Sequence, residues 1–473
     1  MKNPSIRSKA RRLSGIPVLP AKIAWQPAAP VAILSRRRFM RGVAAVGAAG
    51  LLSRLSQIDA IAQEVSAGAA SRAPIGPNSP LKISKVETFI HRNSWVFVKI
   101  STDAGIVGWG EMLKDKARAC VGEVQEQTQH LLGQDPRRTT YIWQSLYKHG
   151  FYRGGPVLSA VLSGIDQALW DIKGKAIGLP VYELLGGAVR DRIRVYGSQA
   201  DVTAGRCFAF KTQLRSSDPT ARGGPAAETA APGQDQAQYA GRGRGRQAVR
   251  YSESPAFIDG IVQYFAGLRE RFGRGVQIGV EFHGASQPQA ALRIMKALEQ
   301  FDPMFFEEPT QTENLDVIAD LASRTNVPIA LGERIFTKMG FREVLEKNAA
   351  KIIQPDVCYA GGITELRLIA GMAEAHYVPI APHNPQGPCS LAASCQLDAT
   401  VPNFLIQERG TDTHENMLKN PFRAEAGFLP LPKLPGLGIE FDEDKFMALV
   451  GEPRPYQRSF DDGPDGDGFP VDW

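Results

Sequence analysis

Cysteine is scarce in this sequence, with five among 473 residues, an odd number that includes no Cys-x-x-Cys pair. A disulfide framework and a zinc knuckle are therefore both unsupported, and we interpret the cysteines as small buried hydrophobic residues. Long apolar runs are also missing: Gly42 to Leu52 is weakly apolar, but it is shorter than the roughly 20 residues that span a bilayer. We expect no stable membrane span.

Acidic residues are nearly absent from residues 1–62, which hold eleven Lys or Arg residues and only Asp59 as an acid. This segment contributes +10 to the formal charge of +6, so the remaining chain carries −4. A mildly acidic body argues against binding to nucleic acid.

The basic segment has its own explanation. Ser35 to Arg41 reads Ser-Arg-Arg-Arg-Phe-Met-Arg and resembles a twin-arginine export signal, and Ala60-Ile61-Ala62 is a small-x-small cleavage site. We expect residues 1–62 to be a signal that directs the protein to the periplasm, with a cytoplasmic location if the signal is not used. A basic disordered tail is the alternative. Residues 63–80 are interpreted as a linker.

Residues 81–190 predict a small α+β domain that precedes the main body. Leu81 to Glu111 contains alternating and apolar runs that indicate strands, and Ala117–Leu132 and Val157–Ala176 have helical periodicity. The glycine-rich loop Gly150 to Pro156 lies between these helices. It carries Arg153, which could clamp a carboxylate or hydroxyl of a substrate, although a plain helix connection is an alternative.

From the middle of the chain onward, a short apolar run closed by an ionisable residue recurs at intervals of 26, 26, 23, 27 and 25 residues. A strand, a loop and a helix need about that length, so residues 191–410 predict successive βα units of a closed parallel barrel. Arg192–Tyr196 is the expected first strand. The closing residues would meet at one mouth of the barrel: Glu281, Glu307, Glu333, Asp356, His383 and Glu408.

The pattern is interrupted at residues 198–254, which are rich in Gly, Ala, Gln, Arg and Pro. Phe208–Lys211 is the only strand-like fragment, and it follows the first strand too soon to leave room for a helix. We interpret the interval as an irregular insertion or a disrupted second βα unit. Helical periodicity resumes at Ala256–Phe272. In the C-terminal segment, residues 411–473, a short strand is expected at Leu434–Glu440 and a disordered tail from Asp461.

Three carboxylates, Glu281, Glu307 and Glu333, end successive strands and would be too close to coexist without a cation. Oxygen ligands favour Mg²⁺, with Mn²⁺ as a second possibility. The alternative is that each carboxylate pairs with an Arg or Lys elsewhere.

Two histidines complete the proposed chemistry. Asp356 could hydrogen-bond His383 and raise its basicity, which would make His383 an abstractor of a proton next to a carboxylate. If His283 then protonates a leaving β-hydroxyl, the result is dehydration; if it returns a proton to the α-carbon, the result is epimerisation. A protonated Glu408 could donate a hydrogen bond to the enediolate, or it could simply pair with Arg409.

The order of motifs resembles the mandelate racemase branch of the enolase superfamily. The matching segments are Glu-Phe-His-Gly at 281–284, Phe-Glu-Glu-Pro at 306–309, Gly-Glu-Arg at 332–334, Gln-Pro-Asp at 354–356, Ala-Pro-His at 381–383 and Gln-Glu at 407–408. Phe151 to Pro156, Gly164 to Lys175 and Pro435 to Glu440 resemble the family as well.

The resemblance implies a modified (β/α)7β barrel, of the TIM-barrel type, under an α+β capping domain built from N-terminal and C-terminal segments. It implies Mg²⁺-dependent dehydration of a galactonate-like aldonic acid to a 2-keto-3-deoxy acid, and we expect a homo-oligomer that acts on a small-molecule sugar acid. The residues at the family's positions are Glu281, Glu307 and Glu333 for the metal, His383 with Asp356 as base, His283 as acid, Glu408 as electrophile and Arg153 in the substrate loop.

Two departures from the family pattern stand out. Glu281 occupies a position where the family has Asp, and the expected second strand with a Lys-x-Asn pair is not evident between Ser198 and Ser254. The alternatives are therefore an epimerase or a dehydratase of another acid sugar, such as mannonate or gluconate, and a catalytically degenerate member that binds sugar acids.

Overall fold

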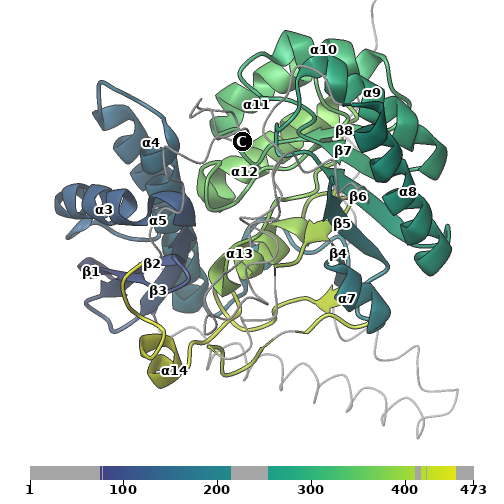
Figure 1. Ribbon diagram of the computed structural model, residues 1–473. Coiled ribbons are helices and arrows are strands. Elements are labelled where there is room, and N and C mark those ends of the chain that lie inside the picture. The colour runs from purple at the N-terminus through teal and green to yellow at the C-terminus, as the bar shows by residue number, and fades with distance from the viewer. Residues whose placement is uncertain (1–74, 77, 215–253, 411–416, 422, 454–473) are drawn as a thin grey trace, which may run out of the picture. The chain divides into compact units, whose positions relative to one another are not determined.

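The computed structural model describes residues 75–76, 78–214, 254–410, 417–421 and 423–453 (Figure 1). The expected signal segment, most of the expected linker, the interval 215–253 and the tail after residue 453 lie outside the described residues. Each of these expectations remains a prediction.

The N-terminal part contains a three-stranded antiparallel sheet in the order β1-β2-β3, with helices packed against it. Helix α5 can approach β3 closely because glycines face each other: a Cβ atom at Gly110 would lie 1.9 Å from the carbonyl oxygen of Gly164. The elements are β1 (Ile83–Ile90), β2 (Val96–Thr102), β3 (Val107–Met112), α3 (Ala117–Leu131), α4 (Thr139–His149), α5 (Pro156–Ile177) and the short α6 (Val181–Leu184).

The second part is a closed barrel of parallel strands. Five strands pair in the order β5-β6-β7-β8-β9, and bridges through Ile380 and Phe404, the β10–β4 pair and the Gly197–Phe210 bridge complete the ring. The strands are β4 (Arg192–Tyr196), β5 (Ala209–Gln213), β6 (Gln277–Glu281), β7 (Phe305–Glu307), β8 (Ile329–Leu331), β9 (Ile352–Ile353) and β10 (Gln407–Glu408).

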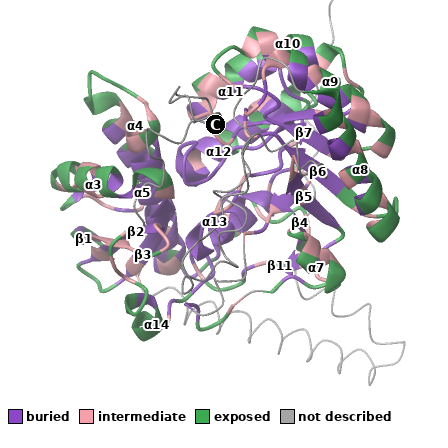
Figure 2. Ribbon diagram, in the orientation of Figure 1, coloured by how far each residue is buried: buried purple, intermediate pink, exposed green. Residues whose placement is uncertain are grey.

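A helix follows each strand position until the last, which confirms the modified (β/α)7β barrel. The helices are α7 (Gln199–Thr203), α8 (Pro255–Phe272), α9 (Pro288–Leu298), α10 (Leu315–Ser323), α11 (Thr337–Glu346), α12 (Gly362–Ala375) and α13 (Pro388–Asp398). The strands are largely buried, and the outer helices such as α8, α9 and α10 expose one face while α13 is buried along its whole length (Figure 2), as expected for a parallel sheet covered by helices.

The strand-like fragment Phe208–Lys211 does overlap a barrel strand, β5, and the expectation that it leaves no room for a helix after the first strand is wrong. Strand β5 pairs in parallel with β6, and Lys211 stands opposite Gly279. The preceding helix α7 has only five residues, and it is held by a capping box in which Ser198 and Asp201 exchange side-chain and backbone hydrogen bonds. This short capped helix therefore connects β4 to β5, although the interval between the two strands seemed too short for a helix.

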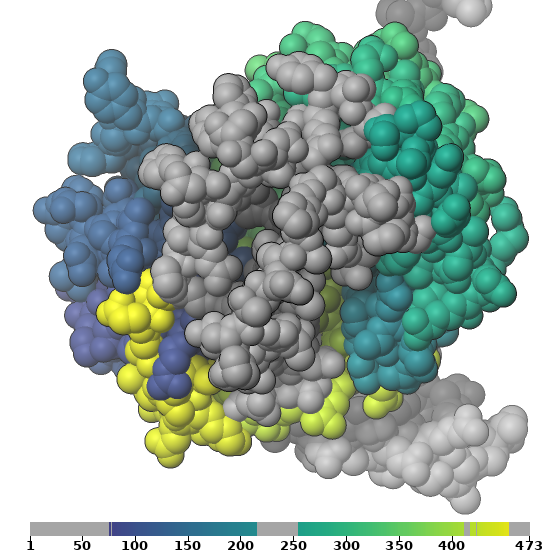
Figure 3. Space-filling model, in the orientation of Figure 1, coloured from purple at the N-terminus to yellow at the C-terminus, as the bar shows by residue number. Residues whose placement is uncertain are grey.

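The C-terminal segment returns to the N-terminal sheet and completes the capping domain. Strand β11 (Phe428–Pro430) pairs with β4, helix α14 (Glu443–Met447) follows, and Val450 forms a bridge with His91. Figure 3 shows this segment in yellow beside the blue N-terminal residues. The strand expected at Leu434–Glu440 is wrong: Gly438 has a φ of +82° and turns the chain.

Buried carboxylates of the capping domain hold helices of the barrel by their N-terminal ends. Glu111 accepts the backbone N–H groups of Gly387 and Ser390 at 2.5 and 3.1 Å, where α13 begins. Asp166 accepts the N–H of Thr364 at 2.9 Å in the first turn of α12. Acceptor oxygens are favourable at helix N-termini, where N–H groups have no partner within the helix. These contacts join the cap to the barrel.

His91 lies in the aromatic cluster that joins β1, β2 and α14. Its ring is 1% exposed, its centroid lies 4.8 Å from that of Phe97 and 4.4 Å from that of Phe446, and neither ring nitrogen has a hydrogen-bond partner. Burial lowers the pKa of His91 to about 4 from 6.5. The imidazole is therefore neutral in the folded protein.

This burial predicts a loss of stability in acid. Between pH 6.5 and pH 4 the unfolded chain binds a proton at His91 that the folded chain excludes, so the free energy of unfolding falls as the pH drops, by up to roughly 3 kcal/mol. Replacing His91→Phe removes this slope, as measured by urea unfolding across that range. The exposed His376→Gln serves as control. Equal slopes for wild type and His91→Phe would contradict the assignment.

Candidate active site

The residues predicted to end successive strands do lie at the carboxyl ends of the barrel strands. Glu281, Glu307 and Glu408 are the last residues of β6, β7 and β10, and Glu333 follows β8 by two residues. Asp356 and His383 each follow their strand position by three residues. Glu281, Glu307 and Asp356 are buried. The barrel thus concentrates negative charge at one mouth.

Lys211 is the cation at the centre of this cluster, and sequence reasoning missed it. Its Nζ atom lies 2.9 Å from Oε2 of Glu281, 2.9 Å from Oε1 of Glu307 and 3.3 Å from Oε1 of Glu408. Burial by itself would lower the pKa of Lys211, but the carboxylates raise it well above its ordinary value. The available signal was Lys211-Thr212-Gln213, a counterpart of the Lys-x-Asn pair that the family resemblance implies.

His383 and Asp356 form the expected pair. The Nδ1 atom of His383 lies 2.8 Å from Oδ2 of Asp356, and its Nε2 atom lies 3.0 Å from Oε2 of Glu333. The other oxygen of Asp356 accepts the backbone N–H of Cys358 at 2.7 Å, which fixes the carboxylate. Burial would lower the pKa of His383, but Glu333 and Asp356 raise it well above its usual range. The imidazole is thereby oriented with Nε2 toward the site.

Glu281 and His283 lie next to each other at the carboxyl end of β6. The backbone N–H of His283 donates to Oε1 of Glu281 at 2.8 Å, and its Nε2 atom lies 3.6 Å from Oε2 of the same carboxylate. Burial raises the pKa of Glu281 despite the neighbouring Lys211. Burial, together with the charge of Glu281, raises the pKa of Glu307 to about 8. Both shifts arise first from burial, and the neighbouring carboxylates add to them.

The structure contains a group of residues that could hold a cation, and this group differs in part from the three predicted carboxylates. Ligand atoms of Glu281, His283 and Glu333 all lie within 4.8 Å of one another. Glu307 is not in this group; its Oε2 accepts a hydrogen bond from Nε2 of Gln354 at 2.8 Å. Oε2 of Glu281 is buried 2.9 Å from Nζ of Lys211, the same lysine that contacts Glu307 and Glu408. Several carboxylates that share one lysine fit a divalent ion.

Glu408 does not pair with Arg409, because Nη1 of Arg409 lies 3.0 Å from Asp201. Glu408 instead accepts the backbone N–H of Asn384 at 2.9 Å. Burial would raise the pKa of Glu408, but Lys211 and His383 lower it below its usual value. In this arrangement Glu408 is therefore an acceptor, whereas its predicted role requires a protonated donor.

Arg153 is not brought to the carboxylates. It is exposed, and it donates hydrogen bonds of 3.5 Å to the carbonyl oxygens of Gly150 and Lys148 in its own loop. The loop nevertheless reaches the barrel, because a Cβ atom at Gly154 would lie 2.9 Å from the ring of Phe336. Phe336 belongs to the loop that carries Glu333. A role of Arg153 in substrate binding remains a prediction.

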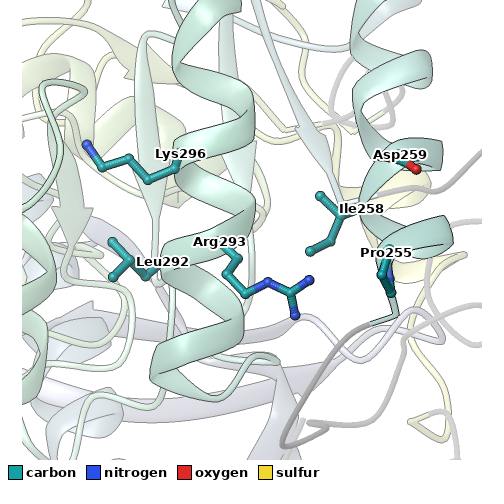
Figure 4. A pocket seen from close by; sticks show the side chains of 6 residues that line it. All are labelled: Pro255, Ile258, Asp259, Leu292, Arg293 and Lys296. Atoms are coloured by element: carbon teal, nitrogen blue, oxygen red, sulfur yellow. The ribbon is translucent and has the colours of Figure 1, made fainter.

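A groove of about 500 Å³ lies elsewhere, between α8 and α9 (Figure 4). It is lined by Pro255, Ile258, Asp259, Leu292, Arg293 and Lys296. None of these is a predicted site residue, so the groove is separate from the barrel mouth. Within the described ranges, no helix is long and apolar enough to span a membrane.

Comparison with known proteins identifies the protein family. The family model for the mandelate racemase / muconate lactonizing enzyme N-terminal domain matches residues 68–186, and the model described as enolase C-terminal domain-like matches residues 235–445. The chain belongs to the mandelate racemase / muconate lactonizing enzyme family of the enolase superfamily.

Individual relatives narrow the comparison. The chain is 41% identical over 387 residues to a D-galactonate dehydratase of Ralstonia nicotianae, covering 79% of this chain and 94% of the relative. It is 40% identical to the D-galactonate dehydratase of Klebsiella pneumoniae over 78% and 94% of the two chains. Both relatives are hydro-lyases. The resemblance to this family that the sequence motifs indicate is confirmed.

Solved structures agree with the fold. An enolase superfamily member from Salmonella Typhimurium has a TM-score of 0.70 at 28% identity, covering 79% of this chain and 99% of its own. An enolase from Agrobacterium radiobacter with bound sodium and L-malate has a TM-score of 0.67 at 30% identity, covering 80% and 97%. The barrel with its capping domain is therefore shared with these proteins.

The role of Lys211 in compensating the buried carboxylates can be tested by mutation. Replacing Lys211→Met leaves Glu281 and Glu307 buried without their cation, which costs about 3–5 kcal/mol. We expect a lower melting temperature in EDTA and partial recovery on addition of Mg²⁺ or Mn²⁺.

Lys296→Met is the matched control. Lys296 lies 2.9 Å from Glu299 at the surface, and exposed pairs of this kind contribute less than about 1 kcal/mol. A Lys211→Met melting temperature as high as that of the control would show that the carboxylates do not depend on Lys211.

Proposed function

We propose that the protein dehydrates D-galactonate or a closely similar aldonic acid to the 2-keto-3-deoxy acid. The main observation in support is that a carboxylate cluster, the His383–Asp356 pair and His283 lie together at one mouth of the barrel. Relatives about 40% identical over most of the chain are D-galactonate dehydratases. Their substrate is the natural first candidate for this site.

The base of the reaction would be His383. Its Nδ1 atom is held by Asp356 at 2.8 Å, so Nε2 is the atom available to a substrate. In the proposed reaction Nε2 takes the proton from the carbon next to the substrate carboxylate, and Asp356 stabilises the imidazolium that results. Because the pair between Nε2 and Glu333 is an ion pair only when the imidazole is protonated, Nε2 has to release that proton and separate from Glu333 before it can take a proton from the substrate.

The carboxylates would hold a divalent ion, Mg²⁺ or alternatively Mn²⁺. We assign Glu281, Glu307 and Glu333 to this role from the family positions, with Glu281 and Glu333 already grouped in the structure. The ion supplies Lewis-acid stabilisation of the charge that develops as the α-proton leaves. Lys211, within 2.9 Å of two of these carboxylates, offers a further positive charge at the same place.

His283 would complete the dehydration as the acid. It lies beside Glu281, on the strand end two positions from the one that carries Glu333 in the barrel order β6-β7-β8. In the proposed reaction it gives a proton to the β-hydroxyl, which leaves as water while the enol tautomerises to the ketone. If it protonated the α-carbon instead, the product would be an epimer.

The complete second strand removes the main argument for a degenerate protein. Lys211 and Gln213 occupy β5 beside β6, where the sequence suggested a missing unit. Mannonate and gluconate remain the alternative substrates, because the structure gives Arg153 no contact that selects a stereochemistry.

The division of roles can be tested with purified protein, Mg²⁺ and a panel of aldonic acids. With D-galactonate, the wild type should form a 2-keto product. Replacing His283→Asn should lower dehydration at least about 100-fold, because general-acid catalysis is lost, while exchange of the α-hydrogen with deuterium oxide continues. Loss of both reactions would contradict a separate acid role for His283.

A second test addresses the base. Replacing Asp356→Asn removes the negative partner of His383, and we expect α-hydrogen exchange and dehydration to fall together by at least about 100-fold. Exchange is followed by NMR and product formation by a colour reaction for 2-keto acids. The matched control is Asp316→Asn, an exposed carboxylate paired with Lys347. Exchange by Asp356→Asn at the control rate would exclude the pair from catalysis.

Export and assembly are separate proposals. The resemblance of Ser35 to Arg41 to a twin-arginine signal supports transport to the periplasm, and a fusion of residues 1–62 to a reporter that is active only after export tests it. We also propose a homo-oligomer, which light scattering on the purified protein tests. Neither proposal involves the described site residues.

A further inference from the structure

Two histidines outside the barrel mouth face each other on the capping domain. His130 lies in the last turn of α3 and His149 is the last residue of α4, and these two helices lie beside each other (Figure 1). The centroids of the two imidazole rings are 4.7 Å apart, and the ring planes are tilted by 55°. Neither histidine takes part in the chemistry proposed for the barrel.

The two rings line one cavity of about 150 Å³. Two of its lining residues, Ile142 and Leu146, are apolar and buried. The others carry polar atoms: His130, Gln134, Tyr141, Ser145 and His149. A water molecule occupies about 30 Å³, so the cavity has room for an ion together with its waters.

The imidazole nitrogens are available as ligands. Among the residues that the structure describes, no hydrogen bond or ion pair involves the ring of His130 or that of His149. Both residues are exposed, so each ring can turn about its side-chain bonds. A neutral imidazole has one nitrogen lone pair that can coordinate a metal ion.

The separation of the rings suits a shared ion. With metal–nitrogen bonds of about 2.05 Å, the centroid of a coordinated imidazole lies about 3.2 Å from the ion. Two such rings are then about 4.5 Å apart if their nitrogens meet the ion at a right angle and about 5.2 Å apart at the tetrahedral angle. The observed 4.7 Å lies between these two values. A rotation of the rings is therefore sufficient to bring both nitrogens to one ion.

The ends of the two helices favour a cation as well. Carbonyl groups in the last turn of a helix have no N–H partner within the helix, and they give that end a partial negative charge. His130 and His149 both belong to such a last turn. A positive ion between the two rings is thus close to two helix ends that stabilise it.

We propose that His130 and His149 together bind one divalent transition-metal ion, Zn²⁺ or Cu²⁺, which joins the C-terminal ends of α3 and α4. Imidazole suits these ions, whereas Mg²⁺ prefers oxygen ligands. Water and the side-chain oxygens of Gln134 and Ser145, in the same cavity, are available for the remaining positions. This site is separate from the carboxylates of the barrel, and the proposal does not depend on the dehydratase function.

The ligand set is tested by pulsed electron paramagnetic resonance of the full chain with one equivalent of Cu²⁺. The starting protein carries His283→Gln and His383→Gln, which remove the imidazoles of the barrel mouth. We expect ¹⁴N coupling from two imidazoles. Adding His130→Gln or His149→Gln should leave coupling from one imidazole at most.

The matched control in that experiment is His376→Gln, because His376 is also exposed and also lies at the C-terminal end of a helix, α12. It should leave the signal of two imidazoles unchanged. Coupling from fewer than two imidazoles in the starting protein would overturn the proposal. So would a signal of two imidazoles that persists without His130 or His149.

Zn²⁺ binding gives a second readout that does not depend on activity. An ion that binds the folded protein alone raises its melting temperature, so Zn²⁺ should raise that of the wild type more than that of His130→Gln or His149→Gln. Calorimetry should show that each substitution weakens one Zn²⁺ site at least about 10-fold. The control His376→Gln should behave as the wild type does. Equal Zn²⁺ binding by the wild type and both variants would contradict the site.

Light scattering distinguishes an ion held within one chain from an ion shared by two copies. The mass of the protein should not change when one equivalent of Zn²⁺ is added. A Zn²⁺-dependent increase in mass that His149→Gln abolishes would show that the ion bridges separate chains, and the proposal would be wrong. Turnover of D-galactonate by a protein without this Zn²⁺ site would refute the site and leave the dehydratase function intact.

Discussion

The mouth of the barrel is governed by one electrostatic constraint: several carboxylates are buried together and require positive charge. Lys211 meets part of this requirement, with Nζ within 3.3 Å of Glu281, Glu307 and Glu408. Burial raises the pKa values of Glu281 and Glu307 even beside this lysine, and neighbouring carboxylates add to the shifts. Burying like charges is costly unless a cation compensates them. The position of Lys211 and the raised basicity of His383 follow from this one constraint, and the proposed divalent ion would meet it as well.

The two imidazoles of the site have different surroundings. His383 is held between two carboxylates, Asp356 and Glu333, which favour its protonated form. His283 lies on the other side of Glu333 in the strand order, next to Glu281. The strand ends that carry Glu307 and Glu333 lie between the two imidazoles. Their different surroundings, rather than their chemical type, support the different roles that we propose for them.

Much of the site could be predicted because strand ends in a parallel barrel recur at near-constant spacing. That regularity placed Glu281, Glu307, Glu333, Asp356, His383 and Glu408 at one mouth, where the structure has them. Phe208–Lys211 could be recognised as strand-like but not as the second barrel strand, because a helix of only five residues precedes it, and Lys211 was therefore missed as a site residue. The left-handed turn at His283 and the pairing of Arg409 with Asp201 could not be read from spacing. Both depend on contacts between residues distant in the chain or on a backbone angle.

The way the cap is attached has a mechanical consequence. The loop between α4 and α5 connects two helices that are bonded to the barrel, α4 through the Trp143 hydrogen bond to the carbonyl oxygen of Gly361 and α5 through Asp166. Its ends are therefore fixed, while its middle, Phe151 to Arg153, is exposed. Because these anchoring bonds come from the two helices, side chains in the exposed middle can be replaced without loosening the attachment. Rigidity at the ends and tolerance to substitution in the middle are thus combined in one short loop.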